Sequence, residues 1–247
     1  IDISGTAKGL PDINKTFLDL NIKKLYVTKG DILVAVPKKS LPPSIELPNV
    51  INAKGNFKGS MTDFNTNMNI QTDMGGAIVI AGMNGPKGRE SYKADISLNN
   101  FNVGRLLKMQ PKLGRVSVKA NVAGTGLDPK KINAKFNAKV LSAYYNKYTY
   151  RNLSLAGTYA NQNINIKSNM PDSNANFNLD AKVNMAGKYP AVKANLNLKQ
   201  VNLQSLNFSP SVLSAAGIVK VDLQTADADH LNGTVDITSL QVVKDAQ

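Results

Sequence analysis

The chain has no cysteine and no tryptophan, and His230 is its only histidine. The lack of cysteine excludes disulfides, thiolate metal sites and cysteine nucleophiles. A single histidine argues against histidine-based metal binding and acid–base chemistry. The apolar runs are short, far below the ~20 residues that a membrane-spanning helix needs. We therefore expect a protein that is not an enzyme and that uses no metal or other cofactor.

The sequence begins at Ile1 rather than at methionine and shows no signal peptide. We expect one continuous β-rich fragment, 1–247, of a larger envelope protein whose membrane anchor lies outside this chain. The segment 37–48 (PKKSLPPSIELP) is rich in proline, which disfavours central strands. It predicts a loop that crosses a sheet edge and marks a weak subdomain boundary.

Positive charge exceeds negative charge by a wide margin. The formal net charge is +13, and Glu46 and Glu90 are the only glutamates. Such an excess suits an anionic partner such as lipid headgroups, lipopolysaccharide or nucleic acid. It equally suits plain solubility, with lysines that protect sheet edges from aggregation. The lysines are spread along the sequence, so charge alone does not choose between these readings.

The stretch 114–157 has the alternation of half-buried β-strands. Apolar residues occupy every second position from Val116 to Val122 and from Ile132 to Val140. A period of two gives a strand one apolar and one polar face. The same alternation elsewhere predicts roughly fourteen strands in all. The expected fold is all-β: an elongated, curled antiparallel sheet, a meander with an apolar concave face and at most one or two helical turns.

Strand pairing follows from the turns. A two-residue hairpin turn at 146–147 sets Phe136 opposite Gly157, where the phenylalanine ring can cover the glycine. A second such turn at 161–162 sets Gly157 opposite Ile166. The apolar faces of the three strands coincide in this register, as burial of one face requires.

Other segments predict smaller features. Alternating apolar residues from Leu25 to Val36, on both sides of 29–31 (KGD), predict a hairpin. Strands are also predicted near 63–72, 77–82 and 91–98. Single helical turns are predicted within 101–111 and within 209–216, the latter with proline at its first position.

Two clusters allow either a functional or a structural interpretation. Tyr144, Tyr145, Tyr148 and Tyr150 lie at the predicted hairpin tip, where they could stack on bases or seat a headgroup. Cross-strand pairing of Tyr145 with Tyr148 is the favoured interpretation. The segment 227–230 (DADH) has poor ligand spacing for zinc and no calcium-loop signature, so a solvated turn is favoured over a metal site.

Five segments together resemble a known family. They are 98–107 (LNNFNVGRLL), 114–118 (GRVSV), 122–127 (VAGTGL), 145–157 (YNKYTYRNLSLAG) and 172–179 (DSNANFNL). This pattern resembles the AsmA-like superfamily, and within it the TamB-type translocation and assembly proteins of Bacteroidota. The resemblance spans about residues 50–210 and contains no catalytic fingerprint.

The resemblance implies a large envelope protein that is tethered to the inner membrane and spans the periplasm. It implies a curled "β-taco" with an apolar groove. It also implies roles in phospholipid transport to the outer membrane and in outer-membrane protein assembly, with barrel assembly proteins as partners. Nucleic acid is not an expected partner.

Lipid conduction agrees with the alternating pattern. A two-chain phospholipid carries about thirty methylenes, whose exposure to water costs roughly 20–25 kcal/mol at ~0.8 kcal/mol each. A sheet with one apolar face offers acyl chains a continuous path and needs no signature motif. The candidate groove residues are Val116, Val118, Val122, Phe136, Val140, Leu153, Leu155, Ile164, Ile166, Phe177, Leu179, Val183, Leu196 and Leu198.

Two other functions fit the same sequence. The first is a scaffold or chaperone for outer-membrane protein assembly, in which open sheet edges pair with client strands. The second is a basic surface that binds polysaccharide or nucleic acid, with an affinity that falls steeply with salt. The pattern also leaves open whether the apolar face is an open groove or a filled core.

Overall fold

The computed structural model describes residues 1–10, 12, 16–35, 42–86, 88–227 and 229–244. The chain divides into two compact units, Ile1–Ala123 and Gly124–Gln247. The proline-rich loop lies inside the first unit, and its residues 37–41, like Val36, fall outside the described residues.

Nearly all regular structure is β. In the first unit the strands are β1 (Asp2–Lys8), β2 (Phe17–Thr28), β3 (Val50–Gly59), β4 (Phe64–Thr72), β5 (Gly75–Asn84), β6 (Ser91–Asn102) and β7 (Leu113–Thr125), which ends just past the unit boundary. In the second they are β8 (Asn133–Tyr145), β9 (Tyr148–Ala160), β10 (Asn163–Pro171), β11 (Ala175–Asn184), β12 (Ala191–Asn202), β13 (Leu213–Asp227) and β14 (His230–Lys244). Two short helices, α1 (Lys29–Ala35) and α2 (Val103–Leu106), belong to the first unit.

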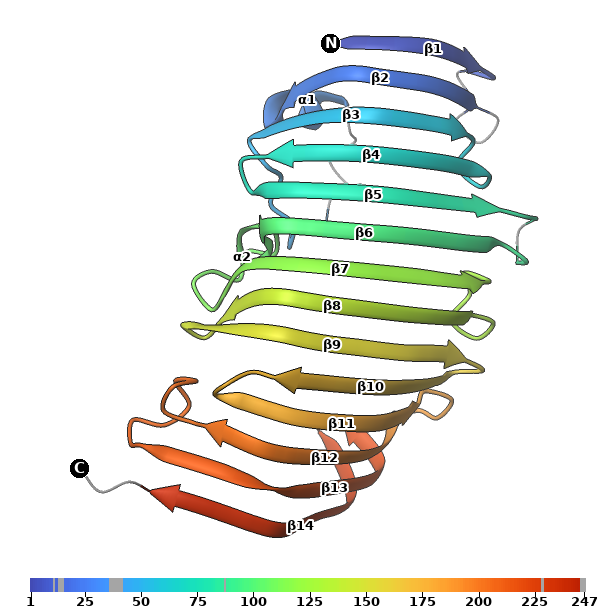
Figure 1. Ribbon diagram of the computed structural model, residues 1–247. Coiled ribbons are helices and arrows are strands. Elements are labelled where there is room, and N and C mark those ends of the chain that lie inside the picture. Colours follow the sequence, from blue (N-terminus) through green and yellow to red (C-terminus); the bar gives the residue numbers. More distant parts are fainter. Residues whose placement is uncertain (11, 13–15, 36–41, 87, 228, 245–247) are drawn as a thin grey trace. The chain divides into compact units, whose positions relative to one another are not determined.

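Within each unit the strands are hydrogen-bonded in the order in which they occur in the sequence (Figure 1). Neighbouring strands run antiparallel. Most connections are short turns, and the longest joins β2 to β3 through residues 29–49. The predicted all-β antiparallel meander with at most two helical turns is therefore confirmed. None of the helices among the described residues is long and apolar enough to cross a membrane.

The register predicted from the two tight turns is also confirmed. Phe136 lies opposite Gly157, and Gly157 lies opposite Ile166. All four turn residues, at 146–147 and 161–162, have φ between 49° and 65°, the left-handed conformation that type I′ hairpin turns require. The ring of Phe136 occupies the place of the missing side chain, because a Cβ on Gly157 would lie 2.4 Å from the Phe136 Cζ.

The hairpin predicted across Lys29-Gly30-Asp31 is wrong. Residues 29–35 form α1, and Thr28 and Asp31 cap it reciprocally. The Asp31 carboxylate accepts the Thr28 N–H at 2.7 Å, and the Asp31 N–H donates to the Thr28 hydroxyl at 3.3 Å. These bonds satisfy two N-terminal donors of the helix. The Thr28 N–H and the Thr28 hydroxyl, which donates to the Asp31 carboxylate at 2.8 Å, lower the pKa of Asp31. This local capping outweighed the alternation of Ile32 and Val34.

Of the two predicted helical turns, one is present. The turn within 101–111 is confirmed as α2, which Asn102 caps by accepting the Arg105 N–H at 2.9 Å. The turn predicted within 209–216 is wrong, because residues 213–216 pair with β14 as the start of β13. Ser209 accepts the Ser211 N–H at 3.1 Å in a local turn instead of capping a helix.

Arg105 holds the 42–49 loop in place, as a clamp, at one end of the strands of the first unit. Figure 1 shows α1 and α2 at the same end. The Arg105 guanidinium contacts Glu46 at 2.9 Å and Asp73 at 2.7 Å. The Glu46 N–H donates to the Leu106 carbonyl at 2.7 Å. The loop thus reaches from the start of β3 to α2, which follows β6, and it passes the β4–β5 turn, whose Met74 is fully buried.

This clamp makes the first unit sensitive to acid. Desolvation acts to raise the pKa of Asp73, but the Arg105 hydrogen bond and the Val50 and Asn49 N–H donors outweigh it, so the pKa is lowered. A lowered pKa stabilises the fold above the ordinary value of 3.8, and the gain disappears as pH falls through the lower folded value. We expect Asp73→Asn to unfold at lower temperature than the parent at pH 7 and to match it more closely at pH 2–3. A temperature difference that does not change with pH would contradict the clamp.

Candidate functional site: the apolar faces

Rows of mostly apolar residues cross the second unit, with a serine, Ser168, and two glycines among them. Each row takes one residue from each of the strands β8 to β14, in hydrogen-bonded register. The rows are Ala134, Tyr159, Ile164, Val183, Val192, Leu223 and Gly233; Phe136, Gly157, Ile166, Ala181, Ala194, Val221 and Val235; and Ala138, Leu155, Ser168, Leu179, Leu196, Val219 and Ile237. At ~4.8 Å per strand, a row of this kind is about 29 Å long.

The structure brings most of the predicted groove residues together on this face. Val140 faces Leu153, and Phe177 faces Leu198, in further cross-strand pairs. All fourteen candidates are half-buried, and none is fully buried. Val116, Val118 and Val122 lie on β7 in the first unit, apart from the eleven others in the second.

Sequence reasoning missed how far the apolar face extends. In the first unit, rows cross β2 to β6: Ile22, Gly55, Met68, Val79 and Ile96, and beside them Leu25, Ala53, Ile70, Ala77 and Leu98. In the second, Val219, Val221, Val235 and Ile237 continue it onto β13 and β14. The signal for all of them was the same period-two alternation.

The apolar faces are only partly covered. The chain exposes 15546 Å² of surface, whereas two separate compact domains of half its mass would expose about 12,900 Å² together. Among the described residues, nine hydrophobic side chains are buried, and four of these nine belong to the rows above: Ile22, Ala53, Ala134 and Ala181. The rows are therefore mostly half-covered surface, and a filled core is confined to particular places.

One such place is an end of the second unit's face, which a small core fills. Met170, Ala175 and Leu206 are buried there against Tyr148, Tyr150, Leu153, Phe177 and Val201. Leu206 belongs to the 203–210 loop between β12 and β13, which reaches back to the β8–β9 turn. The Asn146 amide donates to the Leu206 carbonyl at 3.2 Å, and the Asn207 amide donates to the Asn146 carbonyl at 3.1 Å. The candidates Leu153 and Phe177 thus contribute to this core.

A buried carboxylate anchors the same end. Asp172 is 4 % exposed and accepts hydrogen bonds from the Tyr148 hydroxyl at 2.5 Å, the Arg151 N–H at 3.0 Å and the Asn174 N–H at 2.9 Å. Burial raises the pKa of Tyr148, and Asp172 raises it further. Tyr145 lies opposite Tyr148, so the structural interpretation of the tyrosine cluster is confirmed.

We expect the second unit to lose stability in alkali through Tyr148. A raised pKa means that the neutral phenol stabilises the fold below the ordinary value of 10.0 and that the gain is lost as pH rises through the folded value. Tyr148→Phe leaves Asp172 short of a donor and costs about 1–3 kcal/mol at pH 7. In thermal unfolding, the difference in stability between Tyr148→Phe and the parent should shrink above pH 10. Tyr144→Phe is the matched control, and an equal loss in both variants would contradict this role.

Asp227 and His230, which flank the turn between β13 and β14, have a structural role in the second unit. The His230 ring stacks on Tyr189 with centroids 4.1 Å apart, and its Nδ1 lies 3.3 Å from the Asp227 carboxylate. Within the described part of the chain, no three acidic or histidine side chains gather as metal ligands. The turn therefore joins β13 and β14 to the neighbouring β11–β12 turn.

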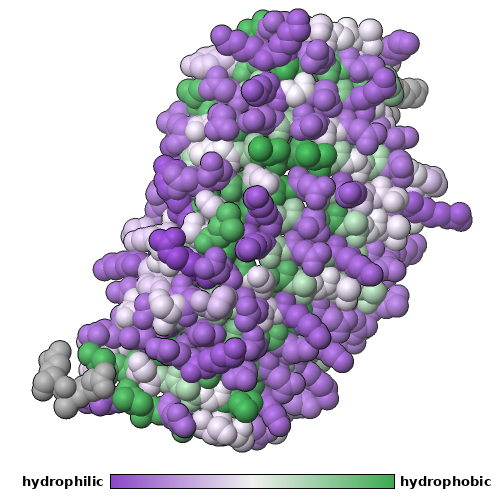
Figure 2. All heavy atoms as spheres, in the orientation of Figure 1, coloured by the Kyte–Doolittle hydropathy of each residue, from purple (hydrophilic) through white to green (hydrophobic). Residues whose placement is uncertain are grey.

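The opposite face of each unit is polar. Asparagine pairs bond across strands, as between Asn169 and Asn178 at 2.6 Å. Lysine and aspartate pair across strands as well, with Lys58 on Asp19 at 2.7 Å and Lys193 on Asp222 at 2.9 Å. Figure 2 shows a face on which hydrophilic residues predominate in both units. These exposed ion pairs add little stability each, about 0–1 kcal/mol.

Comparison with known proteins gave no match. No family model matches the chain, and neither the curated proteins nor the solved structures contain a significant relative. The features that bear on function are therefore the two faces of the sheets and the local sequence resemblance.

Proposed function

We propose that the chain is a non-enzymatic segment of an AsmA/TamB-like envelope protein and that its apolar face guides phospholipid acyl chains between the inner and outer membranes. In this proposal the segment lies in the periplasm, and a part of the protein outside this chain tethers it to the inner membrane. Barrel assembly proteins of the outer membrane are its proposed partners. The proposal rests on the local sequence resemblance together with the apolar rows.

The observation that carries the proposal is the set of half-covered, mostly apolar rows. On β8 the three rows begin at Ala134, Phe136 and Ala138, and Val140 follows on the same face. From Ala134 to Val140 the apolar face covers about 20 Å along the strand. One leaflet of a bilayer holds its acyl chains within about 15 Å. The face is therefore large enough for both chains of one lipid. Each methylene that it shields from water contributes about 0.8 kcal/mol.

The polar face supports the same function. Lysine and asparagine on that side keep the sheet soluble while the apolar side carries the acyl chains. Headgroups can stay in water, so the lipid needs no deep polar pocket. This explains why no catalytic or metal-binding constellation is needed.

Native mass spectrometry of the purified chain tests the proposal. We expect one or more phospholipid masses to remain bound after mild detergent removal and to disappear when the protein is stripped with organic solvent. Added phospholipid should rebind to protein refolded after stripping. A protein that stays lipid-free even with added phospholipid would contradict the proposal.

A further inference from the structure

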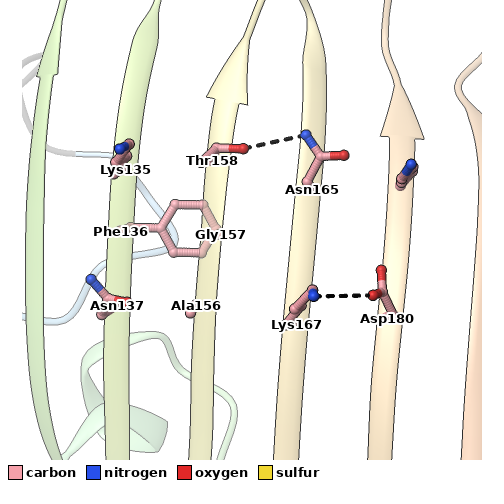
Figure 3. Close-up of a pocket in the computed structure, with 10 residues that line it drawn as sticks. Lys135, Phe136, Asn137, Ala156, Gly157, Thr158, Asn165, Lys167 and Asp180 are labelled. Carbon is pink, nitrogen blue, oxygen red and sulfur yellow. Dashed lines mark hydrogen bonds and ion pairs between the residues drawn. The ribbon is translucent and has the colours of Figure 1, made fainter.

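The polar face of the second unit contains a hollow over β9 (Figure 3). Its volume is about 670 Å³. Ala156 and Gly157 line it on β9, and longer side chains of β8, β10 and β11 stand around it. It lies on the side of the sheet opposite the apolar rows, since Lys135, Ala156, Lys167 and Asp180 alternate with row residues.

The hollow exists because Ala156 is small. On the polar face its methyl group stands between the longer side chains of Asn137 on β8 and Lys167 on β10. Phe136 supports the floor from the other side, because its ring fills the space that a side chain on Gly157 would take. The depression therefore belongs to the packed sheet itself, and it does not depend on a mobile loop.

The rim is positively charged. Lys135, Lys167 and Lys182 line the hollow together with one carboxylate, Asp180. Lys167 lies 3.7 Å from Asp180, a long contact between side chains that are 81 % and 51 % exposed. Three lysines against one aspartate leave an excess of two positive charges, which favours an anionic ligand.

Hydrogen-bonding groups complete the rim. Asn137, Thr158 and Asn165 lie between the lysines, and the Asn165 amide donates to the Thr158 hydroxyl at 3.3 Å. Amides and hydroxyls both donate and accept, as sugar hydroxyls do. A hollow on the polar face of the first unit provides a contrast. It measures about 320 Å³ and pairs a single lysine, Lys93, with a single aspartate, Asp95.

We propose that the hollow over β9 binds an anionic sugar. Lys135 and Lys182 attract its acid group, and the hydroxyls bond to the amide and hydroxyl rim. A volume of about 670 Å³ holds a sugar ring and lies in the usual range of small-ligand sites, about 300–1,000 Å³. The site goes beyond lipid guidance, because it uses the opposite face and needs no apolar groove. It gives the protein a contact to acidic envelope polysaccharide.

Titration of the whole chain with three probes tests the site. Galacturonate carries both the sugar and the charge, galactose carries only the sugar, and inorganic phosphate carries only charge. We expect galacturonate to shift the amide NMR signals of Ala156 and Gly157 and to bind about tenfold more tightly than either of the others. If phosphate binds as tightly as galacturonate, the hollow recognises only negative charge and not a sugar. If galactose binds as tightly as galacturonate, the lysines contribute nothing to the affinity. Either result, or no galacturonate binding, overturns the proposal.

Variants locate the effect. Lys135→Gln combined with Lys182→Gln should weaken galacturonate binding about tenfold, since each lost charge near the ligand weakens it about threefold. Ala156→Val fills the floor with a good strand former and should also weaken binding. Lys220→Gln and Ser154→Val change the same face away from the hollow and should bind like the parent. Losses as large in these controls would overturn the assignment.

Discussion

Leu179→Asp is expected to lower phospholipid transfer by the chain at least about tenfold, because burying an ionised carboxylate among acyl chains costs several kcal/mol. Leu179 faces Leu196 in the middle of an apolar row. Transfer is measured as movement of a fluorescent phospholipid between donor and acceptor vesicles. Leu196→Asp, on the opposing strand, should have the same effect.

The neighbouring residue provides the matched control. Asn178→Asp places the same charge one position away, on the polar face, and keeps the acceptor for the Asn169 amide. Its transfer rate should equal that of the parent. Circular dichroism verifies that each variant is folded before the rates are compared. Equal transfer by folded Leu179→Asp and Asn178→Asp would contradict guidance by the apolar face, whereas strand addition at the sheet edges would survive both changes.

Met74→Ala is expected to destabilise the first unit by about 2–5 kcal/mol, the usual cost of truncating a buried side chain to alanine. Met74 has no exposed surface and lies in the β4–β5 turn beside the Arg105 clamp. Hydrogen exchange followed by mass spectrometry reports the loss strand by strand. Because the chain has two units, global unfolding would not give one free energy.

An exposed methionine serves as the comparison for this change. Met61 lies in the β3–β4 connection of the same unit and is 63 % exposed. Met61→Ala should change stability by no more than about 0.5 kcal/mol. Faster exchange in β4 to β6 of Met74→Ala, with β9 to β12 unchanged, is the expected pattern. Similar exchange in the two variants would show that the clamped edge holds no core.

The meander could be predicted because its information is local. Alternation gives the faces, and two-residue turns fix the register, so one turn at 146–147 was enough to place Phe136 over Gly157. The mistaken hairpin after Thr28 has a local cause too. The Thr28 and Asp31 side chains form a capping box, which starts a helix. The alternation of Ile32 and Val34 instead predicted a strand at this place.

The covered ends of the faces could not be predicted. Asn146 and Asn207 are 61 residues apart, and Arg105 is 59 residues from Glu46. No periodicity links such positions, because a loop that folds back over several strands can meet any of them. The hollow over β9 was missed for a related reason. Ala156 and Gly157 form its floor only once β8 and β10 flank them, and Lys135 and Lys182 line it from strands that are not neighbours.

Photo-crosslinking to lipid tests the central claim most directly. A photoreactive phenylalanine analogue replaces Leu196 on the apolar face or Asn197 on the polar face of β12, and the protein is irradiated with phospholipid vesicles. Mass spectrometry then counts lipid adducts at each position. Lipid guidance by the apolar rows predicts adducts at position 196 and few or none at 197. Equal labelling of both positions, or labelling of 197 alone, would contradict it.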